Sequence, residues 1–169
     1  MRLSMKISMA MAVVLLIAMV VVNQPLQTSA APQGMISFQL AGSAEQTHAI
    51  IRSWRSDNLP LAKLALWLDF LFVITYLAAL LQLTRHFTRD RPGVRERMIA
   101  RGVRALFIIA GLSDVIENIV LLNNFSPATD SLSLAAAILA LLKYTGFVLG
   151  VAGLVIIRAA RRHPLGHST

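Results

Sequence analysis

Four ionisable side chains within long apolar segments are the residues best able to carry chemistry. They are Asp69, Asp114, Glu117 and Lys143. Charged side chains are costly in lipid, so inside a membrane they normally face a helix bundle or a wet cavity and pair with one another. Such a group can fix helix packing, handle protons or ions, or bind a lipid or small molecule.

The depths of these four charges are similar. Counting about 1.5 Å per residue from one end of each apolar run places them roughly 8 to 16 Å into the membrane. If all four were ionised, three carboxylates and one ammonium would leave a net charge of minus two. We therefore expect Asp114 and Glu117 to retain at least one proton between them, and Lys143 to pair with Asp69 or Asp114. Further hydrogen bonds are expected from Tyr76, Asn118 and Tyr144.

Three functions are compatible with this polar cluster, which comprises Asp69, Tyr76, Asp114, Glu117, Asn118, Lys143 and Tyr144. The first is a non-enzymatic accessory or structural component of a membrane, with the cluster fixing the helix packing. The alternative is a small oligomeric proton- or ion-coupled transporter that uses the charges directly. A lipid-modifying enzyme comes third, and none of these residues is assigned a catalytic role.

Lys143 shares its helix face with three glycines, Gly146, Gly150 and Gly153. Small residues at this spacing allow a neighbouring backbone to approach closely. We therefore expect this face to pack against another helix, so that the charged face and the packed face coincide.

Four apolar runs must position these residues, at 7–22, 61–83, 103–122 and 132–157. The last three can cross a hydrocarbon core of roughly 30 Å. The first lies in segment 1–22, a span or a signal peptide, because basic residues precede it and small residues follow it at 28–31. The 169 residues are 56% hydrophobic with a mean hydropathy of +0.66. We predict one all-α transmembrane domain, 1–169, a four-helix bundle with three spans if the first is cleaved.

Seven arginines lie in the link between the second and third runs or at its border with the third run, and they indicate the topology: Arg85, Arg89, Arg91, Arg95, Arg97, Arg101 and Arg104. Basic residues near span ends remain in the cytoplasm, so the link 84–102, the tail 158–169 and both termini are expected there. This accounts for the net charge of +8 without a nucleic-acid partner. The same arginines could also contact anionic lipids.

The segment 23–60 is then exported, and we expect a short amphipathic helix in it. Ser43 followed by Gln46 resembles a capping box. Trp54 would anchor this helix at the headgroups, whereas the alternative is an ordinary linker helix.

Other chemistry is disfavoured by the composition. The chain has no Cys, and its four His residues lie outside the apolar runs. Neither haem nor a metal is therefore expected, and no cofactor is predicted. The expected partners are the lipid bilayer, a membrane protein or further copies of the chain.

Three short motifs resemble small bacterial four-span integral membrane proteins, a group without an assigned activity. They are Leu68-Asp69-Phe70-Leu71-Phe72, Asp114-Val115-Ile116-Glu117-Asn118 and Leu142-Lys143-Tyr144. The resemblance implies a multi-pass protein of the bacterial inner membrane and adds no mechanism.

Overall fold

The computed structural model describes residues 3–89 and 94–160, and this part of the chain is helical. It contains six α-helices and one 3-10 turn: α1 (Leu3–Asn23), η1 (Gln24–Leu26), α2 (Met35–Gln39), α3 (Ala44–Ser53), α4 (Arg55–Thr88), α5 (Val94–Asn123) and α6 (Asp130–Ala160). Four of them, α1, α4, α5 and α6, are long and apolar enough to cross a membrane. The predicted all-α fold, with four apolar helices long enough to span a membrane, is confirmed.

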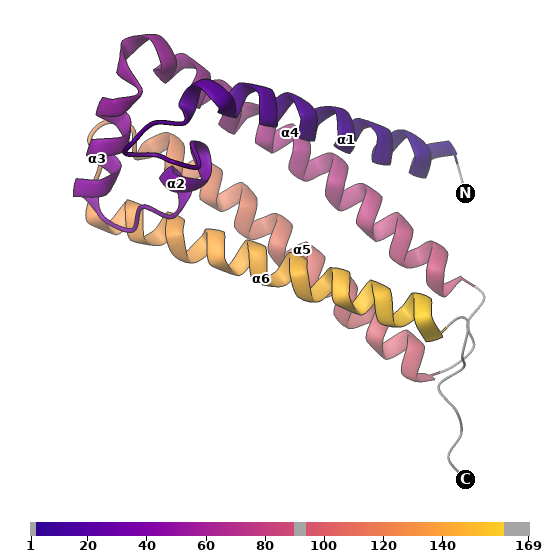
Figure 1. The fold of residues 1–169 in the computed structure, drawn as a ribbon. Coiled ribbons are helices and arrows are strands. Elements are labelled where there is room, and N and C mark those ends of the chain that lie inside the picture. Colours follow the sequence, from indigo (N-terminus) through magenta and orange to yellow (C-terminus); the bar gives the residue numbers. More distant parts are fainter. Residues whose placement is uncertain (1–2, 90–93, 161–169) are drawn as a thin grey trace.

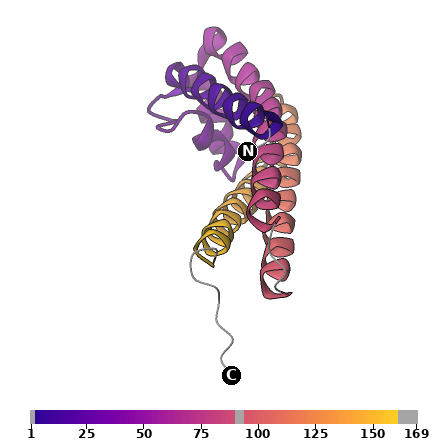
Figure 2. The same ribbon diagram turned by 90° about the vertical axis from the view of Figure 1, so that its right-hand side faces the viewer.

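The long helices run antiparallel to one another in chain order, so both described ends of the chain lie at the same end of the molecule (Figure 1). α1 packs on α4, α4 on α5, and α5 most extensively on α6. Seen from the side, α6 is inclined to α4 and α5 (Figure 2). The α5–α6 pair is therefore the contact around which the rest is arranged.

Two helices extend well beyond the apolar runs that predicted them. The link expected at 84–102 is mostly helical, because α4 continues to Thr88 and α5 begins at Val94. α4 also begins at Arg55, six residues before the apolar run, and Pro60 lies inside the helix. The length of an apolar run reflects the thickness of the lipid core and does not mark the ends of the helix. A helix can continue past the run because Arg and Lys have high helix propensity.

η1, α2 and α3, with the residues that join them, form a folded cap (residues 24–54) over one end of the bundle (Figure 1). Its core includes Phe38 and Trp54, whose ring centroids lie 5.2 Å apart. Trp54 is fully buried and donates a hydrogen bond from Nε1 to the Leu26 carbonyl oxygen at 2.7 Å. A side chain with no exposed surface cannot contact headgroups, so the expected anchor is instead a core residue of the cap.

The cap is tied to α6 by polar contacts. Ser43 caps α3 as its sequence predicted, with its Oγ accepting from the Gln46 amide at 3.3 Å. The Thr47 and Ser133 hydroxyls are 2.8 Å apart, and the Ala44 amide donates to Asp130 Oδ1 at 2.7 Å. α3 therefore packs its inner face on the bundle.

The three glycines of α6 lie at the α5–α6 contact. A Cβ added at Gly150 would lie 2.4 Å from Phe107 Cε1, and one at Gly153 would lie 2.3 Å from Val103 Cγ2. At Gly146 the nearest atoms would be Ala110 Cβ and the Leu106 carbonyl, both at 3.2 Å. The missing side chains are what allows α6 to approach α5 so closely.

Candidate functional site

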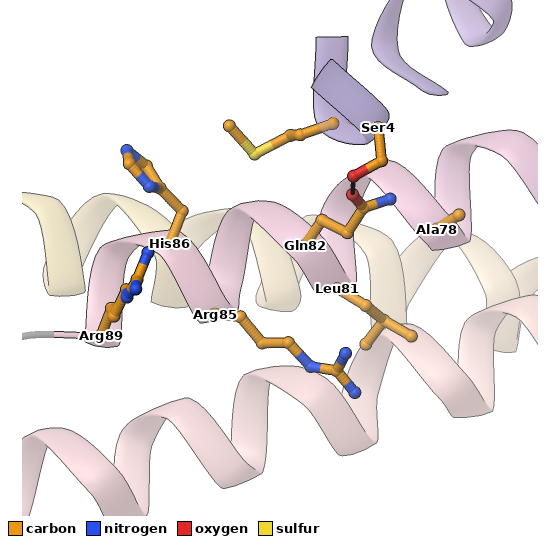
Figure 3. A pocket seen from close by; sticks show the side chains of 8 residues that line it. Ser4, Ala78, Leu81, Gln82, Arg85, His86 and Arg89 are labelled. Atoms are coloured by element: carbon orange, nitrogen blue, oxygen red, sulfur yellow. Dashed lines mark hydrogen bonds between the residues drawn. The ribbon is translucent and has the colours of Figure 1, made fainter. Parts of the chain in front are cut away.

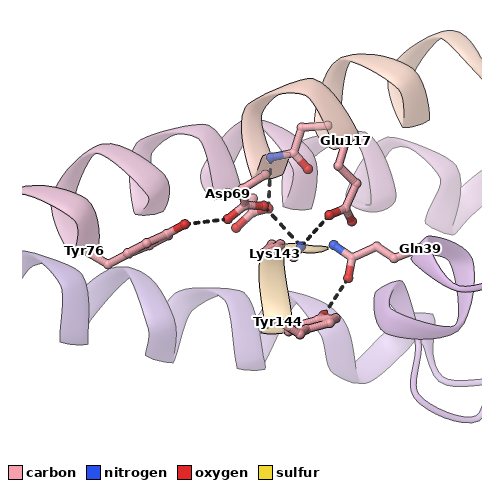
Figure 4. Close-up of polar contacts among 8 residues, drawn as sticks. Gln39, Asp69, Tyr76, Glu117, Lys143 and Tyr144 are labelled. Carbon is pink, nitrogen blue, oxygen red and sulfur yellow. Dashed lines mark hydrogen bonds and ion pairs between the residues drawn. The ribbon is translucent and has the colours of Figure 1, made fainter. Parts of the chain in front are cut away.

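The four intramembrane charges converge on one place between α4, α5 and α6 (Figure 4). Asp69 comes from α4, Asp114 and Glu117 come from α5, and Lys143 comes from α6. Their exposed fractions are 5%, 3%, 0% and 8%, so all four are buried. The similar depths inferred from the sequence thus correspond to one buried group of charges.

Lys143 bridges two carboxylates of α5. Its Nζ lies 2.8 Å from Glu117 Oε2 and 3.1 Å from Asp114 Oδ1. The sequence had indicated Asp69 or Asp114 as the partner, and Glu117 is the closer of the two observed. Asp114 and Glu117 are three residues apart and share a face of α5, and the close α5–α6 packing brings the ammonium between them.

Asp69 and Tyr76 connect α4 to the same group. The Asn118 amide donates to Asp69 Oδ2 at 2.9 Å, and the Tyr76 hydroxyl donates to Asp114 Oδ2 at 3.1 Å. Asp114 therefore accepts from both neighbouring helices, once from an ammonium and once from a hydroxyl. These contacts fix the rotation of α4 and α6 relative to α5.

Tyr144 links the polar cluster to the cap. Its hydroxyl donates to Gln39 Oε1 at 2.9 Å, and its ring centroid lies 4.9 Å from Lys143 Nζ. Gln39 belongs to α2 and is only 6% exposed. Sequence reasoning missed Gln39, because a lone glutamine in a short helix carries no signal of a buried partner more than a hundred residues away.

Two acceptors of the polar cluster are unsatisfied by the protein. Glu117 Oε1 and Asn118 Oδ1 are buried and have no hydrogen-bond donor among the described residues. Buried polar atoms are nearly always paired. These two oxygens are therefore the atoms of the cluster able to accept a hydrogen bond from water or from a bound molecule.

The arginines of the basic link are divided between two helices. Arg85 and Arg89 lie at the end of α4, whereas Arg97, Arg101 and Arg104 lie in the first turns of α5. Arg91 lies outside the described residues, as do the side chain of Arg95 and residues 161–169 of the tail, whereas Arg158 belongs to the last turn of α6. The Arg104 Nε donates to the Ala100 carbonyl at 3.2 Å.

Within the described ranges, no group of three or more His, Asp or Glu side chains is arranged to hold a metal ion. The three carboxylates of the polar cluster are engaged instead by Lys143, Tyr76 and Asn118. No family model, curated protein or solved structure matches this chain. The function must therefore be inferred from the site itself.

Proposed function

We propose that this protein is a non-enzymatic accessory or structural component of a membrane, whose helix bundle is specified by the polar cluster. The observation that carries the proposal is the bridge from Lys143 to Glu117 and Asp114, with all three side chains buried. One ammonium held by two carboxylates of the next helix defines a single register for α6 on α5. Polar contacts of this kind are widely used to specify helix association in membranes.

The surroundings of the polar cluster support a structural role. The cluster lies under the cap, with Gln39 on Tyr144, and its charged members are at most 8% exposed. A substrate could reach them only after the cap or a helix had moved. A separate cavity toward the other end of α4 begins at Ala78, nine residues from Asp69, which is about 14 Å along the helix.

A partner for this component would meet α1 most easily. Only 6% of the apolar window of α1 is buried in the structure, against 33% to 44% for the other three. Its exposed face includes Val13, Ile17 and Val21. Lipid, a membrane protein or a second copy would cover this face, which suits an accessory component.

In this proposal the protein lies in the bacterial inner membrane with both termini in the cytoplasm and the cap exported. The arginines of the 84–102 link support this orientation through the positive-inside rule. Reporter fusions test it: a fusion after His163 and one within 89–97 should be cytoplasmic, and one at Thr129 should be exported. An exported reading at 89–97 would reverse the arrangement.

A second candidate is a small proton- or ion-coupled transporter, and a specific observation favours it. The buried charges sum to minus two when all are ionised, and Glu117 Oε1 has no described donor. A group in this position could take up and release a proton. The two functions are distinguished by the proton flux into sealed vesicles that contain the wild-type protein and an internal pH dye.

If the role is structural, vesicles that contain the protein should leak protons at the same rate as empty vesicles. An added ionophore is the positive control. A flux that is lost in Glu117→Gln, while the variant remains folded, would replace the structural proposal with the transporter. Purification of the wild-type chain in a fixed stoichiometric complex with one membrane protein would support the accessory role.

A further inference from the structure

A pocket of about 690 Å³ lies between the first turns of α1 and the last turns of α4 (Figure 3). It is lined by Ser4, Met5, Ala78, Leu81, Gln82, Arg85, His86 and Arg89. The polar cluster is not part of it, and nothing in the proposed function depends on it. This α1–α4 pocket has a chemistry of its own.

The lining of the α1–α4 pocket is basic on one side. Five of its eight residues come from α4 at positions 78, 81, 82, 85 and 86, and Arg89 is the C-cap of that helix; all six share one helix face. Arg85, His86 and Arg89 provide the nitrogen donors, and none of the eight lining residues is acidic. Planar guanidinium groups donate in pairs to phosphate oxygens, so this lining complements a phosphate.

The lining also changes from apolar to polar along α4. Ala78 and Leu81 come first, and the two arginines follow Leu81 one and two turns later. The apolar run of α4 ends just before Arg85, so the arginines lie where the hydrocarbon core gives way to headgroups. The order matches a phospholipid, whose phosphate lies above its acyl chains.

α1 forms the second wall and is fixed by side-chain contacts. The Ser4 hydroxyl donates to Gln82 Oε1 at 3.0 Å (Figure 3). Gln82 Nε2 in turn donates to Ser8 Oγ at 3.3 Å. Gln82 thus holds the start of α1 against α4. Arg85 and Arg89 are exposed, which leaves their guanidinium groups accessible.

We propose that the α1–α4 pocket binds the phosphate-bearing headgroup of an anionic phospholipid, with Arg85 and Arg89 on the phosphate and the acyl chains against Ala78 and Leu81. Basic pockets between transmembrane helices are known to hold such headgroups. The volume is within the range of about 300 to 1,000 Å³ typical of ligand sites. A soluble phosphate compound would satisfy the arginines but would leave the apolar wall unused.

The test is native mass spectrometry of the full chain, released from micelles that contain equal amounts of phosphatidylglycerol and phosphatidylcholine. The wild type should retain phosphatidylglycerol preferentially. The double variant Arg85→Gln/Arg89→Gln should weaken this retention on the order of thirtyfold, since each basic residue near a charged surface contributes about fivefold.

The matched control is Arg101→Gln/Arg104→Gln, which removes the same charge from the basic link of the other helix. These residues are not among those that line the pocket. The control should weaken retention less than threefold, an order of magnitude below the effect expected in the pocket. Equal losses in both double variants would show general attraction to basic residues and overturn the proposal.

Glycerol 3-phosphate added to the wild type separates lipid from soluble ligands. It should not displace the lipid at equal concentration, because it lacks acyl chains. Displacement at equal concentration would overturn the lipid assignment and identify a site for a soluble phosphate compound. Circular dichroism and the thermal midpoint should be unchanged in both double variants. If the positive charge at position 85 binds the lipid, Arg85→Lys should retain more phosphatidylglycerol than Arg85→Gln.

Discussion

Replacing Lys143 by Met tests whether the polar cluster fixes the fold. The substitution removes one ammonium and leaves Asp114 and Glu117 facing each other's charge in a buried site. Glu117→Gln removes the closer partner, and the double variant Lys143→Met/Glu117→Gln removes both. The free energy of coupling between the two positions is the quantity of interest.

The magnitude follows from the geometry. At an effective dielectric constant near 20, charges at the observed separations of 2.8 and 3.1 Å attract by about 5 to 6 kcal/mol each. Desolvation offsets most of this, because burying each ion costs several kcal/mol. Measured couplings between polar residues in a membrane bundle average about 0.6 kcal/mol and reach about 1.7. We expect Lys143→Met to destabilise the protein by about 2 to 3 kcal/mol, and the coupling to be about 1.5 kcal/mol.

The assay is reversible unfolding in mixed micelles by titration with a denaturing detergent, followed by far-UV circular dichroism. Lys63→Met is the matched control, since Lys63 is exposed near the start of α4 and lies over the Phe125 ring at 5.6 Å. It should change the free energy of unfolding by less than about 0.5 kcal/mol. Additive effects of Lys143→Met and Glu117→Gln would refute the reasoning, because independent residues cannot define a register together.

Two further substitutions test the packing. Gly150→Ala should destabilise the protein by about 1 to 3 kcal/mol in the same titration, because its Cβ would meet the Phe107 ring at 2.4 to 2.9 Å. The control Gly102→Ala should be neutral or slightly stabilising, because its Cβ would meet nothing within 4 Å. Equal effects of the two substitutions would contradict a tight α5–α6 contact. Trp54→Phe should destabilise the cap by about 1 kcal/mol, because the hydrogen bond to the Leu26 carbonyl is lost. The measurement is the rate of proteolysis within residues 24–54, which should rise. An unchanged cleavage rate would argue that this hydrogen bond does not stabilise the cap.

The sequence predicted the polar cluster better than its pairing. The position of an ionisable residue in an apolar run gives its depth and the helix face on which it lies, because helix rise and period are fixed. This was sufficient to predict that the four charges lie together. Which carboxylate Lys143 reaches depends on the rotation and approach of α6, which a few glycines set by packing. Glu117 could therefore not be chosen over Asp69 from spacing alone.

The cap shows a different limit of sequence reasoning. The pattern around Trp54 indicates an apolar face, but lipid and a protein core select the same apolar residues. Only the partners of that face distinguish the two, and here they include Phe38 and Leu26, reached through turns whose path no periodicity encodes. The capping signal of Ser43 was local, so it was read correctly.

The contacts between the cap and α6 set an order of events during synthesis. Thr47 and Ser133 are 86 residues apart, and Gln39 and Tyr144 are 105 apart. At about 5 to 20 residues per second, the partner of Gln39 leaves the ribosome about 5 to 20 s after Gln39 itself. During that interval the residues of the cap have been made, but their bonds to α6 cannot form. The cap can therefore form its own core around Trp54, Phe38 and Leu26 first, and it becomes fixed to the bundle only when α6 supplies Ser133 and Tyr144.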